Sequence, residues 1–439
     1  MQNYVDEIVR SIATGLEDFE QVERLETKPE NLRYFENTAI GWDKVSLSHG
    51  LPGICLLYGK LMETYPNEDR WEKAANRYLG LVVDEINQKG IRDISMFSGL
   101  SGIGLAAFSV SKELQDYQKL IAAINTGVLQ MLPFLTQNIN SRKGTHASLY
   151  DVMAGLTGVL SYLYLFQNDT KCYEGLLTGV DALIELTRTI VIEGVEVPGW
   201  YICAENQFSQ LEKELYAQGG FNTSLSHGIA GPLAILAEMM CQGICRKDQK
   251  EAIHRIVDFY FSYRIVENNR EIWKGQIEFE EVRKKSPNTK NLVKRDAWCY
   301  GSFGICYALI RAGIALKDKK LVEYGIRNVK QAIPDIQGIF SPTFCHGYAG
   351  IYQVLHSIET LASEEVFAEE KSRIKEKILD FYEPKYLYGF YNIEYDHEKG
   401  DFRPYESVGF LEGAAGVALS LFEGEHPGKS VWKRAFLLV

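Results

Sequence analysis

A Gly-x-x-Gly unit followed by an apolar run recurs seven times along this chain of 439 residues. A sequence repeat of this kind indicates copies of one supersecondary unit, each of which buries its apolar face against its neighbours. The repeat therefore constrains the whole chain. The seven units occupy residues 50–53, 99–102, 155–158, 228–231, 301–304, 347–350 and 413–416.

Two kinds of helical segment alternate with these units. The segments that follow the glycines, such as ICLLYGKLMETY and ICYALIRAGIAL, are too continuously apolar for surface helices. Between them lie amphipathic stretches; in residues 248–263 one helical face carries Ile253, Ile256, Val257 and Tyr260. Buried inner helices and amphipathic outer helices predict an all-α fold, an α/α toroid of seven helical hairpins that forms a single domain over residues 1–439.

Three stretches between the hairpins do not have a helical pattern. They are rich in β-branched and aromatic residues that partly alternate with polar ones, as in IVIEGVEVPGWYICAENQF and REIWKGQIEFEEV. We expect small strand-containing insertions around residues 190–222, 264–294 and 384–408.

Charge and composition exclude several classes of protein. The formal net charge of −11 argues against binding of nucleic acid or anionic lipid, because an acidic surface repels phosphate groups. We expect no apolar run that approaches the span of a bilayer, and hence a cytoplasmic protein whose membrane association is peripheral. Eight cysteines in so long a chain do not indicate a secreted disulfide framework, so reduced thiols are expected.

Residues just before the first glycine of a unit, here called the repeat mouth, include candidate metal ligands. Cys299 is the second residue before Gly301, and Cys345 and His346 stand immediately before Gly347. If equivalent glycines lie at equivalent heights, these three side chains converge. Two thiolates and one imidazole suit Zn²⁺ and leave its fourth tetrahedral position open, as in a catalytic site. A packing role is the alternative, since free cysteine is commonly a small buried hydrophobe.

Other repeat mouths supply a base, an acid and a cation. His227 precedes Gly228, Asp151 lies four residues before Gly155, and Arg295 lies four residues before Cys299. His49 stands in the same local sequence, SLSHG, as His227. The local sequence therefore does not rank these two histidines.

The ordered motifs SLSHG, YDVMAGLTG, SHGIAG, RDAWCYG, FCHGYAG and FLEGAAG resemble the lanthionine synthetase C family, specifically its stand-alone class I cyclases of lantibiotic maturation. The resemblance runs from about Ser46 to Gly416. It implies a toroidal fold and one zinc ion per chain. It also implies that the zinc ligands are Cys299, Cys345 and His346 and that the active-site residues are His227, Asp151 and Arg295.

The function implied by the resemblance is formation of lanthionine and methyllanthionine rings. Cysteine thiols of a dehydrated lantibiotic precursor peptide would add to its dehydroalanine or dehydrobutyrine residues. Arg295 or nearby donors would stabilise the enolate, and His227, oriented or charged by Asp151, would return a proton to Cα; the division of labour between His227 and Asp151 stays open. The implied partners are a dehydratase and an ABC transporter, in a complex at the inner face of the cell membrane.

Three alternatives remain at this point. A LanC-like protein can join thiols to dehydrated residues outside lantibiotic synthesis, or only bind peptide. A protein prenyltransferase also uses a zinc thiolate within a helical toroid, but it needs a basic diphosphate pocket and an Asp, Cys and His ligand set. An α/α glycosidase would use Asp151 and Glu412 as its two carboxylates and leave the cysteines and histidine unexplained.

Overall fold

The computed structural model describes the chain except for residues 1, 36–37, 112–115, 140–142, 397–399 and 430. The chain divides into two compact units. The first combines both ends of the chain, Met1–Asp93, Phe97–Ile124 and Ile339–Val439, and the second contains Ile94–Met96 and Asn125–Gly338. The single domain expected over residues 1–439 stays a prediction.

The first unit contains four of the predicted inner helices. They are α3 (Leu51–Thr64), α5 (Leu100–Ser109), α16 (Tyr348–Ala362) and α18 (Ala414–Glu425), and the first glycine of a repeat is the N-cap of each. Helix α16 packs on α18, α18 on α3, and α3 on α5. Their side chains are buried on most faces, as expected from continuous apolar runs.

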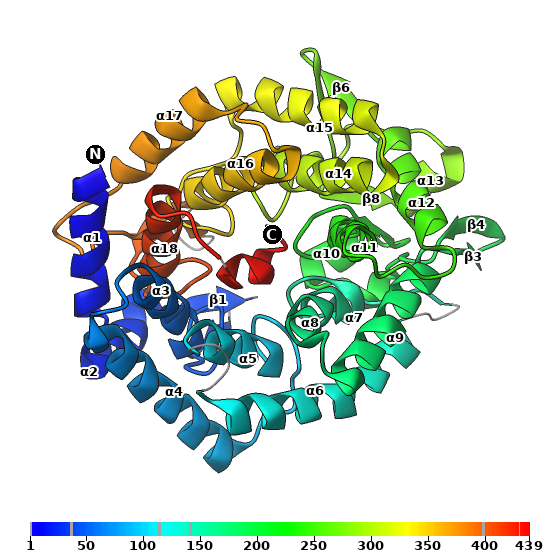
Figure 1. Ribbon diagram of the computed structural model, residues 1–439. Coiled ribbons are helices and arrows are strands. Elements are labelled where there is room, and N and C mark those ends of the chain that lie inside the picture. Colours follow the sequence, from blue (N-terminus) through cyan, green and yellow to red (C-terminus); the bar gives the residue numbers. More distant parts are fainter. Residues whose placement is uncertain (1, 36–37, 112–115, 140–142, 397–399, 430) are drawn as a thin grey trace. The chain divides into compact units, whose positions relative to one another are not determined.

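Outer helices cover these inner helices. Helix α4 (Asp69–Lys89) packs on α3, and α17 (Ala368–Leu379) packs on α16. Helix α18 is covered by α1 (Gln2–Gly15), which Figure 1 shows in blue beside the red α18. Helix α1 buries Val5, Ile8, Val9 and Ile12 along one face. The first helix of the chain thus completes the last hairpin, a pairing that the repeat spacing did not reveal, and α2 (Phe19–Glu26) follows it.

The second unit contains the other three inner helices. They are α8 (Leu156–Leu163), α11 (Ala230–Cys241) and α14 (Ser302–Leu316), covered by α9 (Thr170–Leu186), α12 (Gln249–Ser262) and α15 (Lys319–Ala332). Helix α11 packs on both α8 and α14. The predicted apolar face of α12 is the buried one: Ile253, Ile256, Val257 and Tyr260 are all buried.

Helix α6 (Gln118–Asn138) runs from the first unit into the second. It is long and apolar enough to cross a membrane by length and composition, which corrects the expectation that no such run exists. Within the second unit Val128 and Leu132 are buried, and the Tyr162 hydroxyl donates to Asn125 Oδ1 at 2.6 Å. These contacts are those of an outer helix with one face on the core.

Among the residues that the structure describes, the strands form five two-stranded antiparallel sheets. The first unit has the pairs β1 (Arg33–Phe35) with β2 (Thr38–Ile40) and β9 (Asn392–Asp396) with β10 (Asp401–Tyr405). The second has β3 (Thr189–Ile192) with β4 (Val195–Pro198), β6 (Ile265–Glu267) with β7 (Arg270–Ile272), and β5 (Gly220–Asn222) with β8 (Gln276–Glu278). The β1–β2 pair was not predicted, and residues 397–399 of the third predicted insertion lie outside the described residues.

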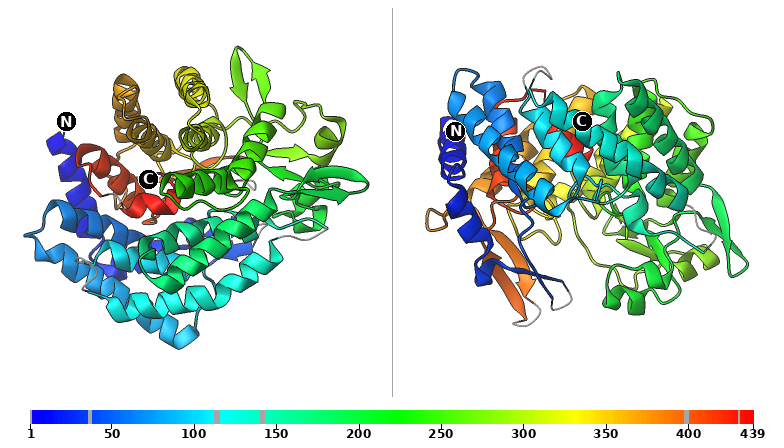
Figure 2. Two further views of the ribbon diagram at one scale, coloured as in Figure 1. Left: turned by 45° about the vertical axis from the view of Figure 1, so that its right-hand side comes forward. Right: turned by 90° about the horizontal axis from the view of Figure 1, so that it is seen from below.

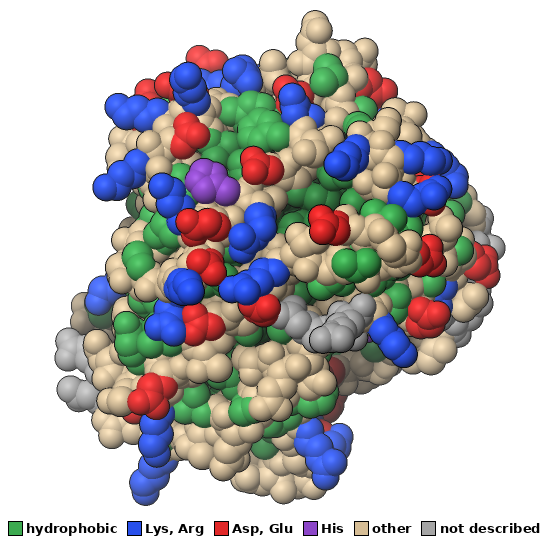
Figure 3. Space-filling view, turned by 90° about the vertical axis from the view of Figure 1, so that its right-hand side faces the viewer, with side chains coloured by type: hydrophobic (Ala, Val, Ile, Leu, Met, Phe, Trp, Pro, Cys, Tyr) green, Lys and Arg blue, Asp and Glu red, His purple; other side chains and the backbone are tan. Residues whose placement is uncertain are grey.

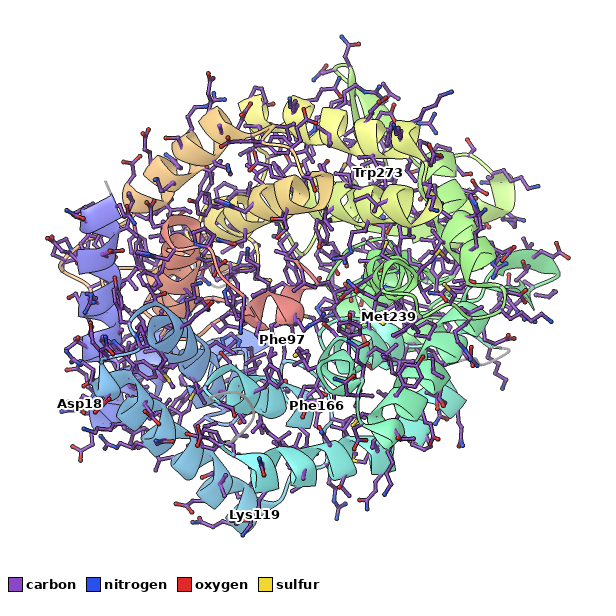
Figure 4. The ribbon with its side chains drawn as sticks, in the orientation of Figure 1. Asp18, Phe97, Lys119, Phe166, Met239 and Trp273 are labelled. Atoms are coloured by element: carbon purple, nitrogen blue, oxygen red, sulfur yellow. The ribbon has the colours of Figure 1, made fainter. Side chains whose placement is uncertain are left out.

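The predicted insertions of the second unit are not purely strand-like. Helix α10 (Gln210–Leu215) lies in the first and α13 (Phe279–Lys284) in the second, each opened by a capping box. Trp273, labelled in Figure 4, donates from Nε1 to Tyr260 O at 2.9 Å and so ties the second insertion to α12. The remaining short elements are α7 (Ala147–Tyr150), η1 (Pro29–Asn31), η2 (Tyr164–Phe166), η3 (Ala204–Asn206), η4 (Ile333–Asp335) and η5 (Val431–Phe436).

Polar contacts occur at the surface of each unit. In the first unit the β9–β10 hairpin, orange in Figure 2, is joined to the segment before β1 by a hydrogen bond from Arg403 Nη1 to Glu30 O of 2.9 Å. Acidic and basic side chains are interspersed over the face in Figure 3. Within the second unit, Arg246 Nη2 pairs with Asp181 Oδ2 at 2.6 Å.

Backbone hydrogen bonds align the repeat mouths within each unit. In the first unit the Cys345 N–H donates to Leu411 O at 3.0 Å, Leu411 N–H to Ser48 O at 2.9 Å, and Ser48 N–H to Phe97 O at 3.2 Å. In the second unit the Ser226 N–H donates to Cys299 O at 3.3 Å. Each of these residues is the second before the first glycine of its repeat. Equivalent mouth residues of successive repeats are therefore neighbours within a unit.

Candidate functional site

His227 and Asp151 form a hydrogen-bonded pair in the second unit. Asp151 follows α7 and is fully buried, and its Oδ2 lies 2.7 Å from His227 Nδ1. Its other oxygen, Oδ1, accepts the N–H groups of Ala154 and Gly155, each at 2.7 Å. A Cβ on Gly155 would lie 2.4 Å from Asp151 N, so this turn requires glycine. The structure thus brings together two of the predicted active-site residues.

The environment of His227 changes its protonation. Burial lowers the pKa of the imidazole, but the hydrogen bond to Asp151 and its negative charge outweigh burial and raise the pKa above 6.5. The His227 side chain is 31% exposed, so a partner can still reach it. The raised pKa favours the protonated imidazole, which is the form that can donate a proton.

Phe208 covers one side of His227. The two ring centroids lie 5.0 Å apart in an edge-to-face arrangement, and Phe208 also contacts His146 in the same way at 5.7 Å. Phe208 stands between η3 and α10, within the first predicted insertion. Sequence reasoning did not identify it, because no local pattern links residue 208 to the repeat mouth at residue 227.

Tyr300 and Asn222 support the same loop. Asn222, the last residue of β5, donates from Nδ2 to the Tyr300 hydroxyl at 3.0 Å and accepts the Ser224 N–H on Oδ1 at 3.0 Å. Burial raises the pKa of the Tyr300 phenol, which therefore stays neutral and can donate its O–H. Sequence reasoning gave Tyr300 no role. The available signal was its position immediately before Gly301, which His227 and His346 occupy in their own repeats.

Cys299 lies beside the His227 loop. Its side chain is buried, and its carbonyl accepts the N–H groups of Leu225 and Ser226 at 2.9 and 3.3 Å. The following Gly301 has a φ of 92°, and a Cβ there would lie 1.5 Å from Arg295 O. Only glycine permits this closed turn, which determines the position of Cys299.

Arg295 lies at the start of that turn, with an exposed side chain. It lines a cavity of about 150 Å³ together with Arg270, Asp296 and Gln337. Within the described part of the chain, no hydrogen bond or ion pair links its guanidinium to His227 or Asp151.

Cys345 and His346 lie in the first unit, at the mouth of α16. The Cys345 sulfur and an imidazole nitrogen of His346 are within 4.8 Å of each other. His346 Nε2 is 2.6 Å from Glu394 Oε1, and Nδ1 is 4.0 Å from Glu412 Oε1. A thiol beside an imidazole whose second nitrogen faces a carboxylate is an arrangement typical of zinc ligands. Glu394 was not predicted, since it comes from strand β9.

His49 has a different setting from His227. It lies in the first unit with its Nε2 4.0 Å from Glu412 Oε2. The carboxylate of Asp151, in contrast, is at hydrogen-bond distance from His227. This difference supports His227 as the histidine with an acid–base partner.

The other six cysteines have settings that favour packing or surface exposure. Cys55, Cys172 and Cys306 are buried, and burial raises the pKa of all three thiols, that of Cys172 to about 12. Cys241 and Cys245 are exposed and Cys203 is partly exposed. None of the eight cysteines, all of which are among the described residues, is in a disulfide.

Comparison with known proteins identifies the family. The family model described as lanthionine synthetase C-like protein matches residues 41–437. The chain belongs to the lanthionine synthetase C-like family. The motif-based resemblance is thereby confirmed over nearly the whole chain.

Two relatives are similar to this family member over most of their length. The nisin biosynthesis protein NisC of Lactococcus lactis subsp. lactis is 29% identical over 399 residues, which are 90% of this chain and 89% of that protein. The solved structure of nisin cyclase matches with a TM-score of 0.81 and 26% identity, covering 100% of this chain and 98% of that one. This match confirms the predicted fold class, an all-α chain of the α/α-toroid type with small strand-containing insertions.

Proposed function

We propose that this chain is a zinc-dependent lanthionine cyclase, which forms thioether rings in a dehydrated lantibiotic precursor peptide. The support is its membership of the lanthionine synthetase C-like family and its similarity to NisC and nisin cyclase over most of their length. One observation carries the chemistry: His227, which is paired with Asp151, lies on the loop whose Ser226 N–H donates to the carbonyl of Cys299. A proton donor is thus adjacent to a candidate zinc ligand.

The zinc ligands that we propose are Cys299, Cys345 and His346. Their donor set, two thiolates and one imidazole, fits zinc and leaves one position for a peptide thiol. Within the first unit, the hydrogen bond of His346 Nε2 to Glu394 leaves Nδ1 as the nitrogen available to a metal. Bound zinc would lower the pKa of a peptide thiol that ligates it, so that the sulfur is a thiolate at neutral pH.

Two residues act on the peptide in this proposal, and a third positions one of them. When the sulfur bonds to Cβ of the dehydro residue, the electron pair of the carbon–carbon double bond moves onto the adjacent carbonyl as an enolate. Arg295 is the cation that stabilises this charge, and protonated His227 returns a proton to Cα. Asp151 orients His227 and favours its charged form. The net change is addition of S–H across the double bond.

The proposed reaction also implies partner proteins and a cellular compartment. The substrate must already contain dehydroalanine or dehydrobutyrine, so a dehydratase has to act first. We propose that the chain works in the cytoplasm with this dehydratase and an ABC transporter, in a complex at the inner face of the membrane. Co-purification of the three proteins from cells, with and without the membrane fraction, tests this placement.

Metal content tests the proposed zinc site. Elemental analysis of the purified chain, after washing with a weak chelator, should find one zinc per chain. Cys299→Ala, Cys345→Ala and His346→Ala should each lose it. Cys245→Ala, which removes an exposed cysteine, should keep it. Well-folded wild-type protein without zinc would overturn the thiolate chemistry.

Thiol alkylation tests the ring-forming activity. Ring closure leaves the mass of the dehydrated peptide unchanged but removes one free thiol per ring, so alkylation followed by mass spectrometry counts the rings. The wild-type chain should protect the peptide thiols from alkylation, and His227→Ala should retain zinc but close rings slowly. Transfer of added glutathione to the peptide, without ring closure, would favour the alternative of thiol addition outside lantibiotic synthesis.

A further inference from the structure

We propose that Glu394 is a positioning residue for His346, which fixes the imidazole tautomer and directs Nδ1 to the metal. The inference rests on the proposed function, because it takes His346 as a zinc ligand. It concerns a carboxylate that lies outside all repeat mouths, on strand β9 of the third insertion.

The contact between the two side chains determines which nitrogen carries the proton. Glu394 Oε1 lies 2.6 Å from His346 Nε2, a length typical of a charge-assisted hydrogen bond. A neutral imidazole has one N–H donor and one acceptor nitrogen, and a carboxylate can only accept. In the neutral imidazole the proton is therefore on Nε2, and Nδ1 is the nitrogen that presents a lone pair to a metal.

The position of Glu394 is itself determined by a buried amide. Asn392 is fully buried and donates from Nδ2 to Glu394 Oε1 at 3.1 Å. Its Oδ1 accepts the hydroxyls of Ser341 at 2.6 Å and Thr343 at 3.1 Å. Ser341 and Thr343 belong to the segment that runs directly into Cys345 and His346. Asn392 thus links strand β9 to the segment that presents the proposed ligands.

The far side of the hairpin is also anchored. Arg403 of β10 is the register partner of Glu394, and its guanidinium donates to Glu30 O at 2.9 Å and to Leu32 O at 3.4 Å. The hairpin therefore has contacts on both sides that do not involve a metal. Such contacts preorganise Glu394 before a metal binds, which is how outer carboxylates increase the affinity of a histidine site.

Zinc affinity is the first test. Competition with a chromophoric chelator, on the full chain, should show about 10- to 100-fold weaker zinc binding for Glu394→Ala. Glu394→Gln should show a smaller loss, because its amide oxygen still accepts an N–H. The control Asp401→Asn changes a carboxylate on the exposed part of the same hairpin and should leave the affinity unchanged. Unchanged affinity in Glu394→Ala, with one zinc in the wild type, would overturn the inference and leave the proposed function intact.

The tautomer of His346 provides a test that needs no zinc. Nitrogen-15 NMR of the metal-free chain should show a proton on Nε2, and Glu394→Ala should show a mixture of tautomers. A wild-type proton on Nδ1 would overturn the inference whether or not zinc binds. Cobalt substitution tests the remaining possibility: Glu394→Gln should keep the wild-type ligand-field bands, and altered bands would mean that Glu394 is a ligand rather than a positioning residue.

Discussion

Asp151 uses one carboxylate oxygen to close its own turn and directs the other to His227. Two backbone N–H groups bind Oδ1, and Oδ2 lies 2.7 Å from His227 Nδ1. Because Asp151 is fully buried, few other orientations are open to it. The imidazole therefore meets a carboxylate whose direction is determined by the backbone.

Replacing Asp151 by Asn should change the pH dependence of ring closure. The pKa of His227 is raised in the folded protein, so the proton donor is present below this pKa and is lost as pH rises through it. Without the Asp151 charge, burial alone lowers the pKa, and the alkaline limb should move to lower pH. The pH–rate profile measures this shift.

A matched control for that profile is Asp181→Asn, which removes a surface carboxylate of the same unit that pairs with Arg246. Its profile should match that of the wild type. His227→Ala should lower the rate by about 10²- to 10⁴-fold with zinc retained, the usual contribution of a positioned acid or base. An alkaline limb that stays in place in Asp151→Asn would contradict the role assigned to Asp151.

Phe208→Ala should slow ring closure without loss of zinc. The Phe208 ring packs edge-to-face on His227 at 5.0 Å, and its removal exposes the imidazole to water. An aromatic contact of about 0.5–1.5 kcal/mol corresponds to a decrease of about 2- to 12-fold in rate. Phe208→Tyr keeps the ring and should keep the rate. Equal rates for all three proteins would show that Phe208 does not affect His227.

Lys274→Met should destabilise the second unit strongly. Lys274 Nζ lies 2.6 Å from Glu281 Oε2, and both side chains are almost fully buried. Removing one partner leaves a buried charge unpaired, which costs about 3–5 kcal/mol in the free energy of unfolding. Denaturant unfolding measures the loss.

The double variant Lys274→Met with Glu281→Gln is the control for that loss. Glutamine removes the charge but keeps an oxygen that can accept the N–H of Glu278, as Glu281 does at 3.0 Å. Part of the stability should return, because the glutamine NH2 cannot also accept the N–H of Asn288, which Glu281 Oε1 accepts at 2.8 Å. A double variant as unstable as Lys274→Met would assign the loss to packing rather than to the unpaired charge.

His356 should make the folded chain sensitive to acid. Burial, together with the charges of Lys371, Lys433 and Lys375, lowers its pKa to about 3. The unfolded chain takes up this proton near pH 6.5 but the folded chain does not. Stability is therefore lost as pH falls from about 6.5 towards 3, by up to about 1.4 kcal/mol per pH unit.

His356→Gln should remove this component of acid sensitivity. Unfolding midpoints in denaturant at pH 7 and pH 5 should differ less in this variant than in the wild type. His254→Gln, which changes an exposed histidine, should leave the wild-type difference unaltered. The same pH dependence in His356→Gln as in the wild type would contradict the prediction.

The helices were predictable because their signals are local. Continuous apolar runs and i, i+3, i+4 faces depend on residues within a few turns of each other, and the buried faces of α12 and α18 follow from them. The strands were less predictable. The β5–β8 pair joins residues 220–222 to residues 276–278, so neither strand pairs with a segment that is close to it in the sequence. Helix α1, near the start of the chain, likewise packs on α18, near its end.

The sequence by itself determined the seven repeats, the inner and outer helices and the candidate residues at the repeat mouths, because glycine spacing and apolar periodicity are properties of neighbouring residues. Only the tertiary structure decided that Asp151 lies 2.7 Å from His227 whereas Glu412 lies 4.0 Å from His49, and that Glu394 reaches His346. These contacts join residues 76 and 48 positions apart. Which side chains meet over such separations depends on the packing of whole helices and strands, which no local pattern specifies.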